Sequence, residues 1–384
     1  MFCLGSTLAF APVQTRVAFR SRSAVASTST EEVDTVPTAN PIDDSATQST
    51  QESSVVRAPL RYVGPYPCLA LKFPQLATQS QRERNVTGVT LDFILDTAAN
   101  TNTINGEVAQ LLDLEVVGEA PSGVAALGAI DGGKTFSLGD CQLDGIPKDD
   151  QFTFMTQLTA SALPVANPAT AGLLSLSFLQ CFEGGVEFTW GTFQDGTEAK
   201  LPSITFYGLR NESEDKVKSM VRVPVEPVPL TLLPSVTVRI NGVDVPALLD
   251  TGSPVTVLNA QAAKIAGIET VDVDTQESRN PFANVAKNFK LAQAASKGEV
   301  LMVAGVDGRM VNLLRSESPV EIGLVGDTDI AEFGKGNVYV GDLPGLQALN
   351  GLGVDSPPAV VLGMDVLRCR PSMLFRAQTN ELFV

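Results

Sequence analysis

The apolar positions of this chain fall in short runs separated by glycine, proline and small polar residues. Two of these runs, 86–95 and 240–249, begin at a Thr-Gly or Asn-Gly turn and end in consecutive apolar residues. That pattern predicts a hairpin that leads into a buried strand. A β-branched segment follows each run, at Thr103-Ile104 and Thr256–Leu258, and predicts a second short strand. Further alternating runs at 221–228 and 235–243 complete a pattern that favours an all-β fold.

A short helix is expected after the second strand of the first region. Its apolar residues are Val108, Leu111 and Leu112, which would face the core.

The same pattern occurs twice because the chain contains an internal duplication. Residues 86–114 align with 240–268 without a gap, and 173–181 align with 361–369, so that Cys181 and Cys369 are equivalent. The features occur in the same order in both regions, which predicts two homologous halves. Identical pairs in the longer block include Gly88/Gly242, Leu95/Leu249, Asp96/Asp250, Thr97/Thr251, Asn105/Asn259 and Ala109/Ala263.

The N-terminal segment differs from the rest of the chain. It has no acidic residue before Glu31, contains several arginines among Ser, Ala and Thr, and continues as a polar stretch to residue 57. This composition is typical of a transit peptide followed by a disordered linker. We therefore divide the chain into a presequence and linker (1–57), an N-terminal lobe (58–218) and a C-terminal lobe (219–384). The proline-rich stretch 224–234 would connect the halves.

Composition excludes several function classes. The 384 residues include no histidine, so Ser-His-Asp and Cys-His catalysis and His-ligated metal sites are ruled out. A net charge of −16 argues against nucleic-acid binding, because the phosphate backbone requires a basic footprint. No apolar stretch approaches the length of a membrane span. The five dispersed cysteines suit neither a disulfide framework nor a zinc site. We expect no cofactor and no metal.

The candidate chemistry lies where each apolar run ends in Asp-Thr. The second copy reads Ala-Leu-Leu-Asp250-Thr-Gly-Ser-x-x-Thr-Val-Leu, and a later Val-Leu-Gly segment begins at Val361. The chain here resembles the pepsin–retropepsin superfamily of aspartic proteases, most closely its retropepsin-like branch. The resemblance covers about 60–384 in two copies and implies an acid-protease fold of two pseudo-twofold-related β-barrel lobes. Asp96 and Asp250 are the catalytic candidates, and the active-site loop residues are Thr97, Ala98, Ala99, Thr251, Gly252 and Ser253.

The physical basis of this chemistry is a pair of carboxylates that cannot both ionise at short distance. They share one proton, as in the aspartic-protease dyad, which is a standard example of this effect. The ionised member accepts a proton from the attacking water, while the protonated member donates a hydrogen bond to the scissile carbonyl. Thr97 and Thr251 would cross-link the two loops through their hydroxyl groups. The implied activity is that of an aspartic endopeptidase.

Two departures from the pattern predict a weakened first lobe. Ala98 stands where the second copy has glycine and adds a Cβ where the loops meet. Ser175 replaces the glycine of the later segment, so the first loop could be backed less closely. Asn102 also stands where the second copy has Thr256. The alternative function is therefore a catalytically inactive pseudoprotease that binds an extended peptide or a protein partner.

Glycine-rich segments in both halves resemble the hairpin flaps that close over substrate in this superfamily. The segment 128–135 also matches the phosphate-binding pattern GxxxxGK[ST]. That loop requires a following helix, and period-two alternation after Lys134 favours a hairpin instead. The flap candidates are Gly128, Asp131, Gly132, Gly305, Asp307 and Gly308.

The expected partner is a peptide or protein substrate, with no nucleic acid and no membrane, and two copies in one chain favour a bilobal monomer. Leu8–Pro12 is similar to the signal-to-transit junction of diatom-type plastid presequences. This resemblance implies plastid import; the alternatives are a secretory or a soluble intracellular location.

Overall fold

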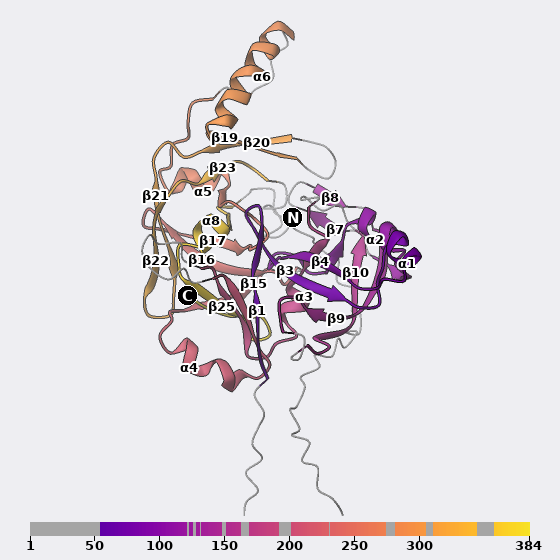
Figure 1. The fold of residues 1–384 in the computed structure, drawn as a ribbon. Coiled ribbons are helices and arrows are strands. Elements are labelled where there is room, and N and C mark those ends of the chain that lie inside the picture. Colours follow the sequence, from indigo (N-terminus) through magenta and orange to yellow (C-terminus); the bar gives the residue numbers. More distant parts are fainter. Residues whose placement is uncertain are drawn as a thin grey trace, which may run out of the picture.

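The computed structural model is a two-lobed, predominantly β structure (Figure 1). The residues it describes are 54–120, 123–125, 128–130, 132–147, 151–162, 169–191, 201–229, 231–273, 281–304, 310–343 and 357–384. Residues 1–53 lie outside them. Among the helices of the described ranges, none has the length and apolar character needed to cross a membrane.

The first lobe is built on one sheet that curves back on itself, because β3 pairs with both β4 and β9. In spatial order its strands are β2 (Arg61–Val63), β3 (Tyr66–Phe73), β4 (Val89–Leu95), β11 (Gly172–Leu174), β5 (Thr103–Ile104), β10 (Met155–Ala162), β9 (Lys134–Leu143) and β6 (Val116–Glu119). Helices α1 (Gln79–Glu83), α2 (Gly106–Leu112) and α3 (Leu176–Leu179) complete this lobe.

The second lobe repeats the central arrangement. Its sheet order is β19 (Val300–Ala304), β20 (Met310–Arg315), β23 (Tyr339–Val340), β18 (Val257–Leu258), β24 (Val360–Leu362), β17 (Val243–Leu249), β16 (Pro234–Ile240), β21 (Val320–Val325) and β22 (Ile330–Gly336), with β15 (Glu226–Pro227) beside β16. The helices here are α5 (Ala260–Ile265), α6 (Pro281–Ser296) and α8 (Met364–Leu367). Figure 1 shows α6 projecting from the body of the lobe.

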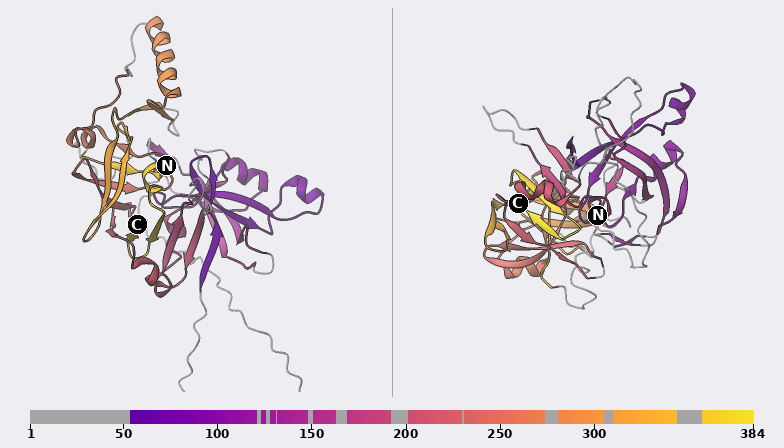
Figure 2. Two further views of the ribbon diagram at one scale, coloured as in Figure 1. Left: turned by 60° about the vertical axis from the view of Figure 1, so that its left-hand side comes forward. Right: turned by 90° about the horizontal axis from the view of Figure 1, so that it is seen from below.

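A third sheet lies under both lobes and joins them. Its order is β1 (Val55–Pro59), β13 (Ser203–Tyr207), β12 (Gly185–Thr189), β25 (Ser372–Arg376), β26 (Glu381–Phe383) and β14 (Arg222–Pro224) (Figure 2). The first three strands come from the first half and the last three from the second, and the halves meet where β12 pairs with β25. The short helices η2 (Arg210–Ser213) and α4 (Glu214–Val217) lie beside it. Strand β1 begins at Val55, so the sequence-based linker boundary at residue 57 was placed too late.

The duplication is visible in the pairing of equivalent strands. Strand β4 runs parallel to β11 with Leu95 opposite Leu174, and β17 runs parallel to β24 with Leu249 opposite Leu362. Strands β5 and β18 then pair antiparallel with β11 and β24. The all-β, two-lobe expectation is confirmed.

Identical residues of the duplicated block have identical structural roles. Asn105 and Asn259 are the N-caps of α2 and α5, and each side chain accepts a backbone N–H of the first turn, as capping asparagines do. Gly242 lies in the β16–β17 hairpin turn at a φ of +83°, and Gly88 lies at the end of the longer β3–β4 connection at a φ of +96°, so a Cβ would be strained at both. The duplication therefore preserves turn and cap positions as well as the strand ends.

The helix prediction was wrong at one position. Helix α2 buries Ala109 and Leu112, whereas Leu111 is 61% exposed. The helix is only seven residues long and contacts the lobe along one narrow stripe, so the adjacent position Leu111 faces solvent.

Candidate active site

The strand pairing brings Asp96 and Asp250 to equivalent places. Each Asp follows the last residue of its strand and donates its backbone N–H to the neighbouring parallel strand: Asp96 to Leu174 at 2.9 Å and Asp250 to Leu362 at 3.1 Å. Both side chains are 1% exposed. In each lobe the apolar strand therefore ends where its Asp side chain lies at the boundary between the two lobes.

Reciprocal hydrogen bonds of Thr97 and Thr251 join the two loops. Each hydroxyl accepts the backbone N–H of the other threonine at 3.1 Å. Each hydroxyl also donates to a carbonyl of the other lobe, Thr97 to Leu249 at 2.7 Å and Thr251 to Leu95 at 2.6 Å. Both threonines are completely buried. The four bonds use the backbone N–H and the hydroxyl group of both threonines, and they fix the relative position of the two Asp-bearing loops.

We expect Thr97→Val to lower the free energy of unfolding by about 2–3 kcal/mol, because it leaves the Thr251 N–H and the Leu249 carbonyl buried without partners. Urea-induced unfolding measures this loss. Thr103→Val is the matched control, since Thr103 is 1% exposed and its Oγ1 has no hydrogen-bond partner. The control should be neutral or stabilising. Equal losses in the two variants would contradict the role given to the threonine pair.

Each carboxyl group is held through one oxygen. Asp96 Oδ1 accepts the Ala98 N–H at 2.8 Å, and Asp250 Oδ1 accepts the Gly252 N–H at the same distance. The Oδ2 atom of each Asp is buried and has no hydrogen-bond partner of normal geometry. Buried polar atoms are almost always paired, so two such oxygens at one place indicate a site for an external group such as water. Each of the two Asp side chains thus has one carboxyl oxygen, Oδ1, that is held by a backbone N–H and another, Oδ2, that is available to an external group.

The two loops approach so closely that position 252 tolerates only glycine. A Cβ built on Gly252 would lie 2.5 Å from Asp96 Cγ and 2.6 Å from its Oδ2. The glycine of the second loop thus lies directly against the carboxyl group of the first. The carboxyl group of Asp96 therefore lies against the backbone of the Asp250 loop.

Burial and proximity raise the pKa of both groups. For Asp250 the largest cause is burial, followed by the negative charge of Asp96, and together they raise its pKa to about 7. The pKa of Asp96 is also raised, chiefly by burial. At pH values between the two apparent pKa values the pair holds one proton, and the two steps belong to the pair. This arrangement provides a carboxylate base and a carboxylic acid side by side.

The remaining loop residues serve as backbone and packing elements. Ala99 accepts the Leu176 N–H at 2.8 Å, and Ser253 accepts the Met364 N–H at 2.9 Å, so each loop is tied to the helix that follows the later segment of its own lobe. Ala98 is fully buried, and its methyl group packs in the apolar cluster of the second lobe that includes Leu233. The extra Cβ that sequence analysis identified as a departure is accommodated there.

The other sequence differences between the two lobes compensate for one another. In the second lobe the Thr256 hydroxyl accepts the Gly363 N–H at 3.0 Å and donates to Asp365 at 2.7 Å. A Cβ on Gly363 would lie 2.3 Å from the Val255 carbonyl oxygen, so this backbone approach requires glycine. The group Thr256, Gly363 and Asp365 is therefore tightly specified.

The equivalent group in the first lobe is Asn102, Ser175 and Ser177. The Asn102 side-chain oxygen accepts both the Ser175 N–H and the Ser175 hydroxyl at 3.0 Å. The Ser175 and Ser177 hydroxyls are 2.8 Å apart, and Ser175 is fully buried. The looser backing that Ser175 suggested is therefore wrong: the longer Asn102 side chain bridges to the serine backbone and fills the space.

Two of the flap candidates, Gly128 and Gly132, lie in the described part of the chain. Gly128 begins β8 (Gly128–Ile130), which pairs with β7 (Gly123–Ala125), and Gly132 follows before β9. In the second lobe β19 pairs antiparallel with β20, from Ala304 opposite Met310 to Val300 opposite Leu314. Asp131, Gly305, Asp307 and Gly308 lie outside the described residues. A strand rather than a helix follows Lys134, which excludes the phosphate-binding loop.

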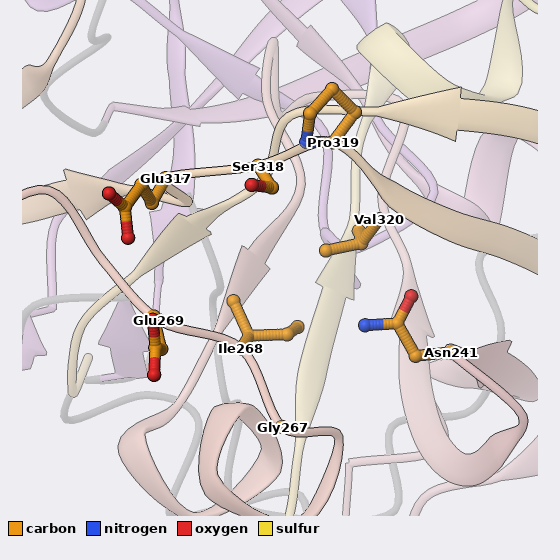
Figure 3. Close-up of a pocket in the computed structure, with 8 residues that line it drawn as sticks. All are labelled: Asn241, Gly267, Ile268, Glu269, Glu317, Ser318, Pro319 and Val320. Carbon is orange, nitrogen blue, oxygen red and sulfur yellow. The ribbon is translucent and has the colours of Figure 1, made fainter.

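A surface pocket lies away from this site. It is formed by the turn after α5 and the start of β21, and Figure 3 shows Glu269 and Glu317 on one side and Asn241 on the other. No residue of either Asp-Thr loop lines it. In the described part of the chain no three Cys, Asp or Glu side chains gather as metal ligands.

Sequence reasoning missed one residue beside the carboxyl pair. Tyr66, the first residue of β3, packs in a small cluster with Cys68, Ile94, Ala99 and Leu173. The charges of Asp250 and Asp96 both contribute to its raised pKa, after burial. Nothing in the spacing of Tyr66 marks it in the sequence, because 30 residues separate it from Asp96.

Comparison with known proteins places part of the sequence in a family. Residues 236–366 match the model of a family described as aspartyl protease. No curated protein sequence matches the chain.

Several solved structures resemble the chain at low sequence identity. Basic 7S globulin from soybean is 13% identical with a TM-score of 0.43, the alignment covering 86% of this chain and 94% of that one. The structure named edgp is 10% identical with a TM-score of 0.43 and the same coverage. Conglutin gamma, a basic 7S globulin from lupine seeds, is 10% identical with a TM-score of 0.44, covering 86% and 95%.

The family match includes the Asp250 loop, the Thr256 group and the Gly363 segment, whose contacts are described above. The first lobe repeats the same strand pairing around Asp96. Residues 236–366 thus match the aspartyl protease family, and the described residues of the whole chain form a two-lobed, predominantly β fold.

Proposed function

We propose that this chain is an aspartic endopeptidase that hydrolyses peptide bonds with water activated by Asp96 and Asp250. The observation that supports this most strongly is the pair of adjacent carboxyl groups, each held at Oδ1 by a backbone N–H and each with Oδ2 unpartnered. An inactive relative has no need of two buried carboxyl groups at this cost, since a buried carboxylate is expensive unless it is paired. The Ala98 and Ser175 departures are both accommodated, which favours the active form.

The chemistry follows from the two protonation states. The ionised carboxylate accepts a proton from water as its oxygen attacks the peptide carbonyl carbon, and the protonated carboxyl donates a hydrogen bond to the carbonyl oxygen. As the water attacks, the protonated carboxyl passes its proton to the carbonyl oxygen, and a neutral tetrahedral diol forms. Its collapse breaks the C–N bond: the pair delivers a proton to the leaving amine nitrogen and takes one back from a diol hydroxyl as the C=O bond re-forms. The pair ends with one proton, as it began.

The surrounding elements suit an extended peptide. The hairpins β7–β8 and β19–β20 are the flap candidates of the two lobes, and strand pairing to such edges is a common way of holding a peptide in extended form. Both carboxyl groups come from one chain, so the proposed catalytic unit is a monomer. The substrate is a peptide or protein.

The expected pH dependence of the activity follows from the raised pKa values of Asp96 and Asp250. Activity requires the singly protonated pair, so kcat/KM should fall above the pKa of about 7 given for Asp250. On the acid side it should fall as the pair takes up its second proton, at a pH above the ordinary value for Asp because the pKa of Asp96 is raised. We expect a bell-shaped profile with a maximum at about pH 5–6.

The test is hydrolysis of a peptide library by the purified full chain from pH 3 to 8, with and without pepstatin. Asp250→Asn, prepared in parallel, reveals any contaminating protease. Pepstatin-sensitive cleavage with the expected profile supports the proposal. Binding of peptides without cleavage at any pH would contradict it and favour a pseudoprotease.

A further inference from the structure

Helix α6 is held to the second lobe at its C-terminal end. Leu291 and Ala294 pack in a small apolar cluster with Val300 of β19. After the helix the chain turns at Gly298, which has a φ of +68° and whose carbonyl oxygen accepts the Tyr339 hydroxyl at 3.1 Å. A helix of 16 residues is about 24 Å long, and Figures 1 and 2 show α6 extending away from the lobe. It is thus a projecting helix anchored at one end.

The side of α6 that faces away from the lobe carries an exposed aromatic ring. Phe289 is 73% exposed, whereas Leu291 is 9% exposed. Successive helix residues differ in direction by about 100°, so these two side chains point about 200° apart. In the sequence, Phe282 and Val285 precede Phe289 by seven and four residues, which is the spacing of one helix face. The sequence thus predicts an apolar stripe on the side of the helix opposite Leu291.

A second exposed apolar side chain lies on the strand that holds the helix. Val300 of β19 packs with α6, and Met302, two residues further along the strand, shares its face. Met302 is 47% exposed, so this face of the strand extends beyond the part that is covered. We refer to Phe289, Met302 and the exposed lysines Lys290 and Lys297 as the α6 surface.

The helix is basic in a strongly acidic chain. Four cations and no acid lie between Glu277 and Glu299, namely Arg279, Lys287, Lys290 and Lys297. The whole chain has a net charge of −16. The α6 surface therefore complements a partner that is both anionic and able to bury apolar side chains. A second copy of the chain fits less well, because contact between two α6 helices would bring like charges together.

We propose that α6 docks the protein on the surface of an anionic membrane, with Phe289 inserted among the lipid headgroups and Lys290 and Lys297 close to their phosphates. A helix with Phe on one side and Lys beside it binds a bilayer surface through apolar burial and attraction to anionic lipid. The same surface repels the acidic body of the protein, which leaves the helix as the side presented to it. The expectation of no membrane partner rested on the lack of a membrane-spanning stretch, and a helix that lies on the surface needs none.

Docking through α6 goes beyond the proposed function and does not depend on it. The helix immediately precedes the β19–β20 hairpin, which is the flap candidate of the second lobe. A protein docked in this way would hold that hairpin close to the membrane.

The test measures sedimentation of the purified full chain with large unilamellar vesicles. One set is phosphatidylcholine alone, and the other also contains about 30% phosphatidylglycerol as the anionic lipid. We expect binding to the anionic vesicles, weakened by added salt. Lys290→Gln should lower the partition coefficient about fivefold, and Phe289→Ser about tenfold. The basic N-terminal segment is common to all variants, so the differences report on α6.

Leu201→Ser and Lys218→Gln are the matched controls. Leu201 is also 73% exposed, and Lys218 is an exposed lysine that is paired with Asp215 at 2.5 Å. Neither belongs to the α6 surface, so both variants should bind the anionic vesicles as the wild type does.

Phe289→Trp gives a second readout of insertion. The natural tryptophan, Trp190, is 4% exposed and should respond little to lipid. The emission of the introduced indole should move to shorter wavelength with anionic vesicles and be quenched by lipids brominated on their acyl chains.

No binding of the wild type to anionic vesicles, equal binding to both vesicle types, or wild-type binding by Phe289→Ser and Lys290→Gln would each overturn the proposal. Self-association without lipid that Phe289→Ser abolishes would also overturn it and assign the α6 surface to a second copy. None of these measurements uses peptide hydrolysis, and Phe289→Ser should leave kcat/KM for a soluble peptide unchanged. Failure of docking and failure of the proposed protease function are therefore distinguishable.

Discussion

Asp96→Asn and Asp250→Asn are each expected to reduce kcat/KM for peptide hydrolysis by about 10³-fold or more. Each substitution leaves the chain with one carboxyl group, which cannot supply both a base and an acid that share a proton. Because the two groups act as a unit, the double variant should be no worse than either single one. Steady-state kinetics at the pH optimum measures all three.

The matched control is Asp92→Asn, on the same strand and face as Asp96 but ion-paired with Arg61. It should keep most of the activity. Thermal unfolding at the assay pH separates lost chemistry from lost fold, and the Asn variants should be at least as stable as the wild type, since a neutral amide avoids a buried charge. Substantial turnover by either Asn variant would contradict the shared-proton mechanism.

Gly252→Ala is expected to reduce kcat/KM by about 10²–10³-fold, which is nearly as large as the loss in the Asp→Asn variants. The new Cβ would fall 2.5 Å from Asp96 Cγ, and that carboxyl group is already fixed by the Ala98 N–H. Relief requires the two loops to separate or the Asp96 side chain to rotate, and small displacements of reacting groups carry large rate penalties. Kinetics with a cleavable peptide, together with the unfolding midpoint, measures the effect.

Ala98→Gly is the comparison at the equivalent position of the first loop. The Ala98 methyl packs among apolar side chains, so its loss should lower stability by about 1 kcal/mol and leave kcat/KM at or above the wild-type value. The two positions are thus expected to differ: activity tolerates a Cβ at position 98 and does not tolerate one at position 252. A large loss of activity in Ala98→Gly, or a fully active Gly252→Ala, would show that the loop contacts are described wrongly.

Sequence reasoning reached the parts of the site that depend on local pattern. The Asp-Thr ends of two apolar runs and the turn glycines each depend on a short window of sequence, and the duplication doubles each signal. The Asp96–Asp250 pairing itself was an expectation from the resemblance, and the structure places the two side chains together through the Thr97–Thr251 bonds.

The features that escaped prediction depend on contacts between distant residues. Tyr66 lies near the carboxyl pair because β3 pairs with β4, across an intervening helix and loop of unpredictable length. Asn102 and Ser175 each looked like a defect alone, and only their mutual hydrogen bonds show them to be compensating. The third sheet joins three strands of the first half to three of the second through the β12–β25 pairing, which no local pattern indicates.

The central claim is that Asp96 and Asp250 titrate as one coupled pair, and carbon-13 NMR of the aspartate carboxyl groups in the full chain tests it most directly. We predict that Asp250 titrates with a midpoint near its pKa of about 7, and that Asp96→Asn lowers this midpoint by about one unit or more, because a neighbouring negative charge is removed. An Asp250 midpoint close to the ordinary carboxyl value of about 4, unchanged by Asp96→Asn, would contradict the account.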